Sequence, residues 1–295
     1  MKRVLITGAN SYVGTSFEKY ISENFADDYT VDTVDTVDTI DGSWREKDFS
    51  EYDVVFHVAG IAHSDNRKNS EKEKNLYYAI NTVLTEEVAK KAKESGVKQF
   101  VFTSSAIVYG DSSHIGQSKI ITPETPVSPS NCYGNSKVQA EKRLEELKSE
   151  DFKIVILRSP MIYGKNSKGN YPLLSKMASK LPFFPFIENQ RSMLYIENLC
   201  EFVRLMIKNE EQGIFWPQNE VYSNTSEMVK AIADVRGKNL KLIKGFTWLI
   251  KLAGLFTGLV DKAFGNLTYD KAMSDYKEEY RIVKFDESIR KTEAE

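Results

Sequence analysis

Tyr133 and Lys137 are the residues of this sequence whose types and spacing best suit acid–base chemistry. They stand four positions apart at the start of NCYGNSKVQAEKRLEEL, residues 131–147, a run typical of a helix, and such side chains share one helix face. An unperturbed Tyr has a pKa of about 10, so half-ionising it near neutrality takes roughly 4 kcal/mol, part of which a fixed ammonium supplies. The pair predicts a tyrosine that works as an acid–base group.

The N-terminal residues have the pattern of a strand, a tight glycine turn and a helix. KRVLIT, residues 2–7, is a short apolar run typical of a buried parallel strand, and Phe17, Tyr20 and Ile21 recur at helical spacing after the turn. Such a unit binds a pyrophosphate on free N–H groups at the helix start. It predicts a dinucleotide-binding site.

The turn itself, GANSYVG, contains the residues expected to hold that dinucleotide. Gly8 permits the turn, and Gly14 lets the helix and strand pack closely. Ser11 stands where the usual fingerprint has its middle glycine, and its hydroxyl is a further donor for a phosphate. The expected cofactor-binding residues of this turn are Gly8, Asn10, Ser11, Tyr12, Val13 and Gly14.

An acidic residue at the end of the second strand is expected to bind the adenosine ribose. The segment YTVDTVDTVDTIDG, residues 29–42, begins as that strand and repeats Val-Asp-Thr, which leaves the register ambiguous. Asp35 is the expected ribose ligand and Asp32 the alternative. A carboxylate there disfavours a 2′-phosphate, and the repeat contains no Arg or Lys, so NAD is favoured with NADP as the alternative.

Two further strands are expected to end at the same edge of the sheet. Residues 54–58 form an apolar run followed by Ala59, Gly60 and Ala62, whose small side chains let a cofactor lie close. Residues 97–110 begin as a strand and lead to Ser104 and Ser105. A serine hydroxyl at this edge can hydrogen-bond a substrate oxygen while a tyrosine moves the proton.

Composition excludes several other classes of protein. The chain has 295 residues, 41% hydrophobic and 28% charged, with a formal net charge of -2, which argues against binding nucleic acid through bulk charge. Two cysteines and three histidines make neither a disulfide framework nor an expected zinc site, so no metal is predicted. The start MKRVLITGAN turns polar too soon for a signal peptide, which favours the cytoplasm.

Six motifs, in this order and spacing, resemble the extended short-chain dehydrogenases/reductases, and within them the NAD-dependent epimerase/dehydratase group that acts on nucleotide-sugars. They are TGANSYVG, VVFHVAGIAH, AINTVLTEEVAKKA, TSSAIVYG, YGNSK and ILRSPMIYG. The resemblance implies an α/β fold, a Rossmann-type doubly wound parallel sheet with a smaller, mainly helical C-terminal substrate domain. We expect the dinucleotide-binding domain at residues 1–165, with a return segment at about 192–220, and the substrate domain at 166–295.

The resemblance also implies roles for individual residues. Ser105, Tyr133 and Lys137 are expected to be the catalytic set, with Lys137 lowering the Tyr133 pKa and binding the nicotinamide ribose. Asn81 is expected to support the active site from its helix, and Ser104 to touch the sugar. In the C-terminal half, Asn170 and Arg191 are expected to bind the diphosphate of the substrate, a task for which a guanidinium is suited.

Several activities share this site. A UDP-4-keto-sugar reductase in surface-polysaccharide biosynthesis is the first expectation, a UDP-sugar 4-epimerase the alternative, and a non-catalytic relative a third. A dehydratase is disfavoured because Ser105 is followed by Ala106 and Ile107 where the family's dehydratases carry an Asp-Glu pair. Relatives commonly form homodimers through two helices, here expected at residues 76–95 and 133–147.

One apolar segment needs a separate interpretation. Residues 241–265 are the most apolar part of the chain, but Lys244, Lys251 and Lys262 interrupt the run. A membrane-spanning helix needs about 20 predominantly apolar residues. We expect packed helices of the substrate domain and no membrane span, with a helix lying at a membrane interface as the alternative.

Overall fold

The computed structural model of the chain describes residues 2–8, 10–25, 29–34, 39, 42–62, 71–254 and 258–294. They form two compact units. The first comprises residues 1–110, 127–159 and 199–216, and the second comprises 111–126, 160–198 and 217–295.

A six-stranded sheet forms the centre of the first unit, and every neighbouring pair of its strands is parallel. The strand order is β10-β6-β4-β3-β1-β2, so the chain starts one strand from an edge, adds β2 at that edge and then winds in the other direction from β3 to β10. This confirms the expected doubly wound α/β fold. The strands are β1 Lys2–Thr7, β2 Tyr29–Val34, β3 Val54–His57, β4 Gln99–Ser105, β6 Lys153–Ser159 and β10 Gly213–Phe215.

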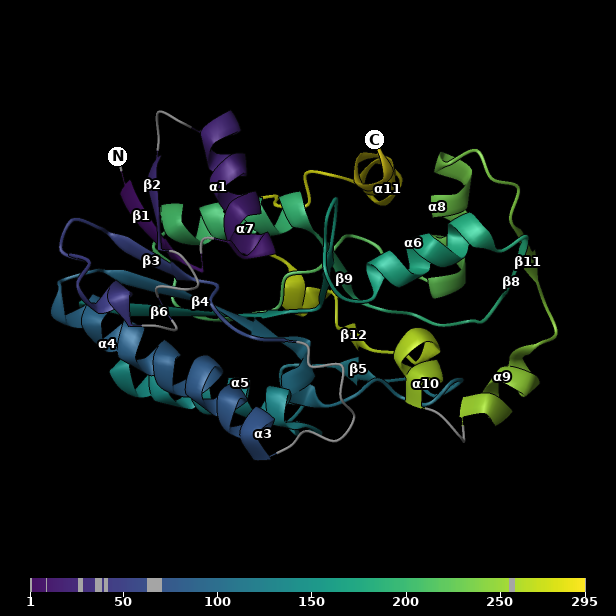
Figure 1. Cartoon of the computed structure of the whole chain (residues 1–295), viewed down its shortest axis with the longest axis horizontal. Coiled ribbons are helices and arrows are strands. Elements are labelled where there is room, and N and C mark those ends of the chain that lie inside the picture. The colour runs from purple at the N-terminus through teal and green to yellow at the C-terminus, as the bar shows by residue number, and fades with distance from the viewer. Residues whose placement is uncertain are drawn as a thin grey trace. The chain divides into compact units, whose positions relative to one another are not determined.

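Helices cover both faces of this sheet (Figure 1). On one face, α1 and α7 lie together, and the Tyr20 hydroxyl of α1 donates to Glu201 of α7 at 2.8 Å. On the other, α4 and α5 pack through Val88 and Leu144 into a core that includes Phe100 of β4. The helices are α1 Tyr12–Asn24, α3 Glu71–Tyr78, α4 Thr85–Glu94, α5 Cys132–Leu147 and α7 Ile196–Lys208, with 3-10 turns η1 Ser43–Arg45 and η3 Ala106–Tyr109.

The helix expected at residues 76–95 is longer and less regular than predicted. Helical structure starts at Glu71, and a π-helical segment, η2 Ala79–Leu84, separates α3 from α4. Single π turns of this kind occur frequently at functional sites. Asn81 lies inside this one.

The second unit contains short strands and helices. Its three two-stranded sheets are parallel and pair β11 with β8, β12 with β5, and β7 with β9. The strands are β5 Ile120–Ile121, β7 Met161–Tyr163, β8 Phe183–Pro185, β9 Met193–Tyr195, β11 Lys241–Ile243 and β12 Thr268–Tyr269. The helices are α6 Tyr171–Lys180, α8 Thr225–Val235, α9 Thr247–Gly254, α10 Gly258–Phe264, the 3-10 turn η4 Ala272–Ser274 and α11 Phe285–Glu293.

The boundary between the units differs from a single cut at residue 165. Residues 111–126 belong to the second unit because β5 pairs with β12, and the Asp270 N–H donates to the Ile121 carbonyl at 2.8 Å. The return segment is residues 199–216, shorter than the expected 192–220. Pairing between residues about 150 positions apart leaves no local signal in the sequence, which is why these limits were missed.

The apolar segment 241–265 forms β11, α9 and α10 of the second unit, as packed elements rather than one long helix. Within the part of the chain that the structure describes, no helix has both the length and the apolar character to cross a membrane.

Candidate active site

The glycine turn between β1 and α1 is built as the sequence predicts. Gly8 has φ +95°, and a Cβ atom there would lie 2.8 Å from the Ala59 backbone nitrogen, so only glycine allows the turn to pass the end of β3. A Cβ on Gly14 would lie 2.8 Å from the Gly8 carbonyl oxygen. Both glycines therefore permit close backbone approach at the start of α1, where N–H groups face a bound anion.

Ser11 has a role that the sequence interpretation did not anticipate. It is the N-cap of α1, and its hydroxyl oxygen accepts from the Gly14 N–H at 2.9 Å. An N-cap serine stabilises a helix start by about 1 kcal/mol relative to alanine. The residue in place of the middle glycine thus fixes the start of α1, next to Asn10, Tyr12 and Val13 of the same turn.

Gly8→Ala is expected to weaken both folding and cofactor binding. The positive φ costs an alanine about 1–2 kcal/mol, and the 2.8 Å approach to the Ala59 nitrogen requires a further backbone shift. We expect the free energy of unfolding to fall by about 2–4 kcal/mol and the affinity for NAD to fall at least about tenfold. Urea unfolding and NAD titration measure the two effects.

Gly96→Ala is the matched control for that change. Gly96 has φ +83° and no atom within 4 Å of a Cβ placed on it. An alanine there would therefore have the unfavourable φ without the steric clash. Equal losses of stability in the two variants, with NAD affinity unchanged in both, would contradict the close approach at Gly8.

Asn81 connects the π-helical segment to the residues after β3 and to α5. Its side chain accepts from the Ile61 N–H at 2.9 Å, and its amide donates to the Ile61 carbonyl at 3.0 Å and to the Ser136 hydroxyl at 3.1 Å. It therefore holds the segment after β3 against α5. A Cβ on Gly60 would lie 3.0 Å from Asn81 Oδ1 and 3.5 Å from Lys137 Nζ, which brings the small residues Ala59, Gly60 and Ala62 to the neighbourhood of Lys137.

His57 is a buried neutral histidine beneath this segment. Its ring nitrogens lie 2.6 Å from the Thr7 hydroxyl and 3.0 Å from the Thr85 hydroxyl, and Thr85 donates in turn to the Asn81 carbonyl at 2.9 Å. Burial, with the nearby Lys137 charge, lowers the pKa of His57 to about 3. Its function is to connect β1, β3 and the π-helical segment.

Tyr133, Lys137 and Ser105 are brought together as predicted. Helix α5 starts at an N-cap, Asn131, which accepts from the Gly134 N–H at 2.8 Å and places Tyr133 in the first turn. The Ser105 side chain, at the carboxyl end of β4, lies close enough to the Tyr133 hydroxyl to lower the pKa of that phenol. Lys137 is buried and donates to the Thr103 carbonyl at 2.8 Å, with its ammonium 4.5 Å from the centre of the Phe102 ring.

The electrostatics of this set differ from the expectation in one respect. Burial raises the pKa of Tyr133 to about 12, and the nearby Ser105 side chain, rather than Lys137, acts against this rise. Burial lowers the pKa of Lys137 to about 8, while the Glu141 charge works in the opposite direction. Ser105 is therefore the direct support of an ionised Tyr133, and Lys137 stays mostly charged at neutral pH.

Ser104 has an internal partner instead of the expected open position beside a sugar. Its buried hydroxyl donates to Glu141 at 2.5 Å, and Glu141 pairs with Arg158 at 2.8 Å. Arg158 also donates to the Tyr109 hydroxyl at 2.6 Å. Alternate residues of a strand point to opposite faces, so Ser104 and Ser105 cannot both face one ligand. This ion pair lies one helical turn after Lys137 and fixes α5 against β4 and β6.

Asn170 and Arg191 lie in the second unit. Asn170 is exposed at the N-cap of α6, and its side chain makes no capping hydrogen bond. Arg191 donates to the carbonyls of Lys262 and Gly265 at 2.9 and 3.1 Å, and burial lowers its pKa to about 10. Among the described residues no ion pair involves this guanidinium, so its charge is available for an anion.

The predicted ribose ligand Asp35 lies outside the described residues. The alternative, Asp32, is part of β2, in register with Leu5 of β1. The choice between them, and with it the basis for preferring NAD, stays a prediction.

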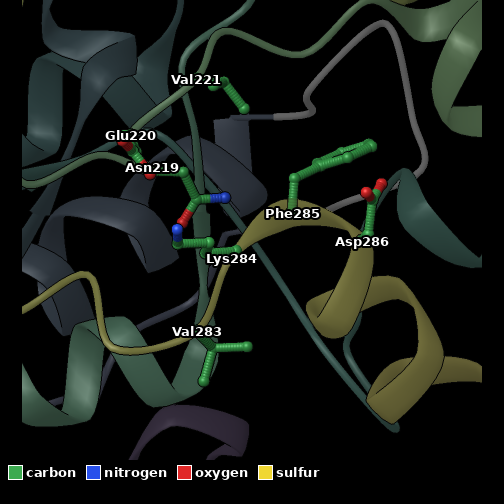
Figure 2. Close-up of a pocket in the computed structure, with 7 residues that line it drawn as sticks. All are labelled: Asn219, Glu220, Val221, Val283, Lys284, Phe285 and Asp286. Atoms are coloured by element: carbon green, nitrogen blue, oxygen red, sulfur yellow. The ribbon is translucent and has the colours of Figure 1, made fainter.

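A cavity of about 280 Å³ lies elsewhere in the second unit, between the residues after β10 and the start of α11. Figure 2 shows Asn219 and Lys284 on one side and Phe285 and Asp286 on the first turn of α11. The Asn219 amide is used internally, since it accepts from the Tyr195 N–H at 3.0 Å and donates to the Tyr163 hydroxyl at 3.1 Å. None of the predicted site residues lines this cavity.

Comparison with known proteins identifies the family. A sequence model described as the NAD dependent epimerase/dehydratase family matches residues 4–217. The UDP-glucose 4-epimerase of Vibrio cholerae is 32% identical over 291 residues, which cover 91% of this chain and 87% of that protein. The chain belongs to the NAD dependent epimerase/dehydratase family.

Two further proteins are similar to this family member. The N-acetyl-alpha-D-glucosaminyl-diphospho-ditrans,octacis-undecaprenol 4-epimerase of Escherichia coli O157:H7 is 30% identical over 225 residues, 71% of this chain and 64% of that protein. The structure of the UDP-glucuronic acid 4-epimerase from Bacillus cereus in complex with NAD has a TM-score of 0.71 at 16% identity and covers 98% of this chain and 94% of that one. The latter shows the shared fold.

The first unit of this epimerase/dehydratase family member fits the family's NAD. The glycine turn with its capped helix start suits a pyrophosphate, the small residues Ala59 and Gly60 leave room beside it, and buried Lys137 adds a cation. The prediction of a nicotinamide-dependent enzyme of nucleotide-sugars is confirmed at the level of the family. The roles of individual residues remain predictions of the geometry.

Proposed function

We propose that this chain is a UDP-sugar 4-epimerase. The observation that carries the proposal is the 32% identity to a UDP-glucose 4-epimerase along 91% of the chain, combined with a complete Ser105–Tyr133–Lys137 set. The 4-ketoreductase expected first from the sequence uses the same three residues. The comparison favours the epimerase because the relative that matches nearly the whole chain carries that name.

The residues of the first unit perform the proton transfers. Bound NAD supplies a hydride acceptor and, once reduced, a hydride donor for the sugar C4. Tyr133 takes the proton of the C4 hydroxyl as the carbon is oxidised, and Ser105 holds that oxygen and the Tyr133 hydroxyl in line. The 4-keto sugar then presents its other face, and Tyr133 returns the proton to the new hydroxyl. Ala106 and Ile107, which cannot transfer protons, leave no acid–base pair for dehydration.

Arg191 and Asn170 are proposed to bind the diphosphate of the substrate. A buried guanidinium without a carboxylate among its described partners suits a diphosphate, and the uncapped Asn170 amide at the start of α6 is a further donor. Arg191→Gln is expected to raise KM for the nucleotide-sugar about 10- to 100-fold with a smaller change in kcat. Steady-state kinetics measure both constants.

Arg236→Gln is a matched control, because Arg236 is committed to Glu293 and lies outside the proposed site. It should leave KM within about twofold of the native value. A kcat that falls while KM stays constant in Arg191→Gln would contradict the assignment to ground-state diphosphate binding.

A turnover assay with three arms tests the proposed reaction. One arm offers UDP-glucose or UDP-N-acetylglucosamine with NAD and separates the products by chromatography. The second offers a UDP-4-keto-6-deoxy sugar with NADH or NADPH and follows the nicotinamide absorbance. The third offers N-acetylglucosaminyl-diphospho-undecaprenol, because one relative is named for that substrate.

Each outcome has a distinct meaning. Formation of the C4 epimer of a UDP-sugar without net consumption of cofactor supports the proposal, whereas epimerisation in the third arm alone would contradict a UDP-sugar as the substrate. Stoichiometric loss of reduced cofactor with the keto sugar alone would replace the epimerase with the reductase. Inactivity in all arms together with intact NAD binding would favour a non-catalytic relative.

A homodimer in the cytoplasm, serving polysaccharide biosynthesis, is the proposed setting. Leu76 of α3 and Val83 of the π-helical segment are 48% and 40% exposed on the helices expected at the dimer interface, which supports such packing. Sedimentation equilibrium tests the dimer.

A further inference from the structure

An apolar and basic surface of the second unit is unused by the proposed reaction. Five large apolar side chains point to solvent there, with Trp248 68% and Phe183 58% exposed. Soluble proteins rarely expose contiguous apolar patches of more than a few hundred Å² without a binding function. We call these five residues the apolar surface: Leu181, Phe183, Phe246, Trp248 and Leu252.

The elements that carry the apolar surface are adjacent. Strand β8 pairs with β11, which places Phe183 opposite Lys241 in the register. Three residues separate the end of β11 from the start of α9, and Figure 1 shows β8, β11 and α9 at the same end of the second unit. On α9, Trp248 and Leu252 are four positions apart and share one helix face.

Both faces of β8 are apolar, although one of them faces solvent. Phe184 is buried and its ring lies 5.9 Å from that of Phe264, whereas its neighbour Phe183 points outward. A strand with one solvated face normally alternates apolar and polar residues. Packing of the second unit therefore accounts for Phe184 and leaves Phe183 unexplained.

The sequence stretch that carries β11 and α9 is basic, although its Arg236 is paired with Glu293. Between Asp234 and Asp261 there is no Asp or Glu, while the whole chain has a formal net charge of -2. Lys244 is exposed, and its ammonium lies 5.4 Å from the centre of the Phe186 ring. The basic residues of this stretch are Arg236, Lys238, Lys241, Lys244 and Lys251.

We propose that this surface docks the protein on an anionic phospholipid bilayer. Exposed Trp and Phe side chains insert at the level of the headgroups, and the lysines contact anionic lipids, as in helices that lie in the membrane interface. Contact is peripheral, consistent with the described helices being unable to span a membrane. A second copy of the chain is the poorer occupant, because a twofold contact brings each basic stretch against its own copy.

Vesicle co-sedimentation tests the docking at low ionic strength. Vesicles of phosphatidylcholine with 30 mol% phosphatidylglycerol are compared with vesicles of phosphatidylcholine alone. The full chain should bind the anionic vesicles at least about tenfold more tightly, and added salt should weaken that binding. Equal binding to both vesicles, or binding to neither, would overturn the proposal.

Substitutions separate the apolar from the electrostatic contribution. Phe183→Ser with Trp248→Ser should reduce binding to anionic vesicles at least tenfold, and Lys241→Gln with Lys244→Gln about 30-fold, since each lysine near the surface contributes roughly a factor of five. The control is Ile282→Ser, 46% exposed in the same unit and outside this surface, which should bind like the native chain. Binding unchanged in both double variants would contradict the assigned surface.

Tryptophan fluorescence locates the contact. Of the three tryptophans, Trp44 is buried and the Trp216 indole donates to the Tyr109 hydroxyl, so a blue shift on adding anionic vesicles should come from Trp248. Trp248→Phe should still bind and lose the shift. If the chain instead forms dimers that the Phe183 and Trp248 substitutions abolish, without vesicle binding, a second copy is the occupant. Urea unfolding of each variant serves as the folding control, so the docking test is independent of the proposed reaction.

Discussion

Tyr133→Phe should lower turnover by about 10³-fold or more while NAD binding stays close to that of the native chain. The substitution removes the hydroxyl that lies beside Ser105 at the carboxyl end of β4 and leaves the ring in place. Among the described residues of the first unit we expect no other acid–base group to replace Tyr133 as the acceptor of the C4 proton. Single-turnover formation of NADH measures the oxidative step, and NAD titration measures binding.

Tyr77→Phe is the matched control for this change. The Tyr77 ring lies 6.1 Å from the Tyr133 ring, so the control alters a hydroxyl in the same cluster without touching the one at Ser105. It should retain turnover within a few-fold. If Tyr133→Phe kept full activity, or if both variants lost it equally, Tyr133 would not be the proton-transfer residue.

Lys137→Met should reduce turnover at pH 7 by about 10²-fold and also change the shape of the pH–rate profile. Burial places the pKa of Lys137 at about 8 and that of Tyr133 at about 12, so the first proton to leave the pair as pH rises comes from Lys137. The productive form, with Tyr133 ionised and Lys137 charged, contains the same number of protons as the form in which both are neutral. The population of the productive form therefore follows the population of the pair with one proton.

The number of protons on the pair determines whether the oxidative rate rises or falls with pH. In the native chain the oxidative rate should rise with pH up to about 8 and then level off, because further alkali no longer changes the population of the one-proton pair. The positive charge of oxidised NAD moves this plateau to lower pH. Without Lys137, the Tyr133 pKa stays at about 12 or above, so the rate should keep rising about tenfold per pH unit through pH 10.

Pre-steady-state NADH formation between pH 6 and 10 distinguishes the two profiles. Lys142→Met, on the same helix but outside the Ser105–Tyr133–Lys137 set, is the control and should reproduce the native plateau. A plateau at the same pH in Lys137→Met would show that another group titrates there, and Lys137 would then be only a structural residue.

Local sequence patterns were sufficient to predict the strands, turn and helix that carry the site of the first unit. The apolar run before Gly8, the turn with its two glycines, and the Tyr-x-x-x-Lys at a helix start each depend on neighbouring residues alone. Parallel strands align their carboxyl ends, so a fold predicted from these patterns already placed Ser105 near Tyr133. The period of each strand or helix and the topology of the sheet determine where these residues lie.

Other features depended on partners far away in the sequence. Ser104 and Ser105 look equivalent as neighbours, yet the Ser104 hydroxyl donates to Glu141, which pairs with Arg158, whereas Ser105 lies beside Tyr133. The π-helical turn at Asn81 has no propensity signature, because it is maintained by hydrogen bonds to Ile61 and Ser136.

The sequence by itself was enough to predict the family and the doubly wound fold, and to propose the reacting residues, since these depend on short motifs in order along the chain. Only the tertiary structure decided how the groups are supported. It showed that Ser105 supports the Tyr133 hydroxyl, that Lys137 turns to the Thr103 carbonyl, and that β5 joins the second unit. Burial and long-range pairing set pKa values and unit boundaries, and neither is encoded in the spacing of neighbouring residues.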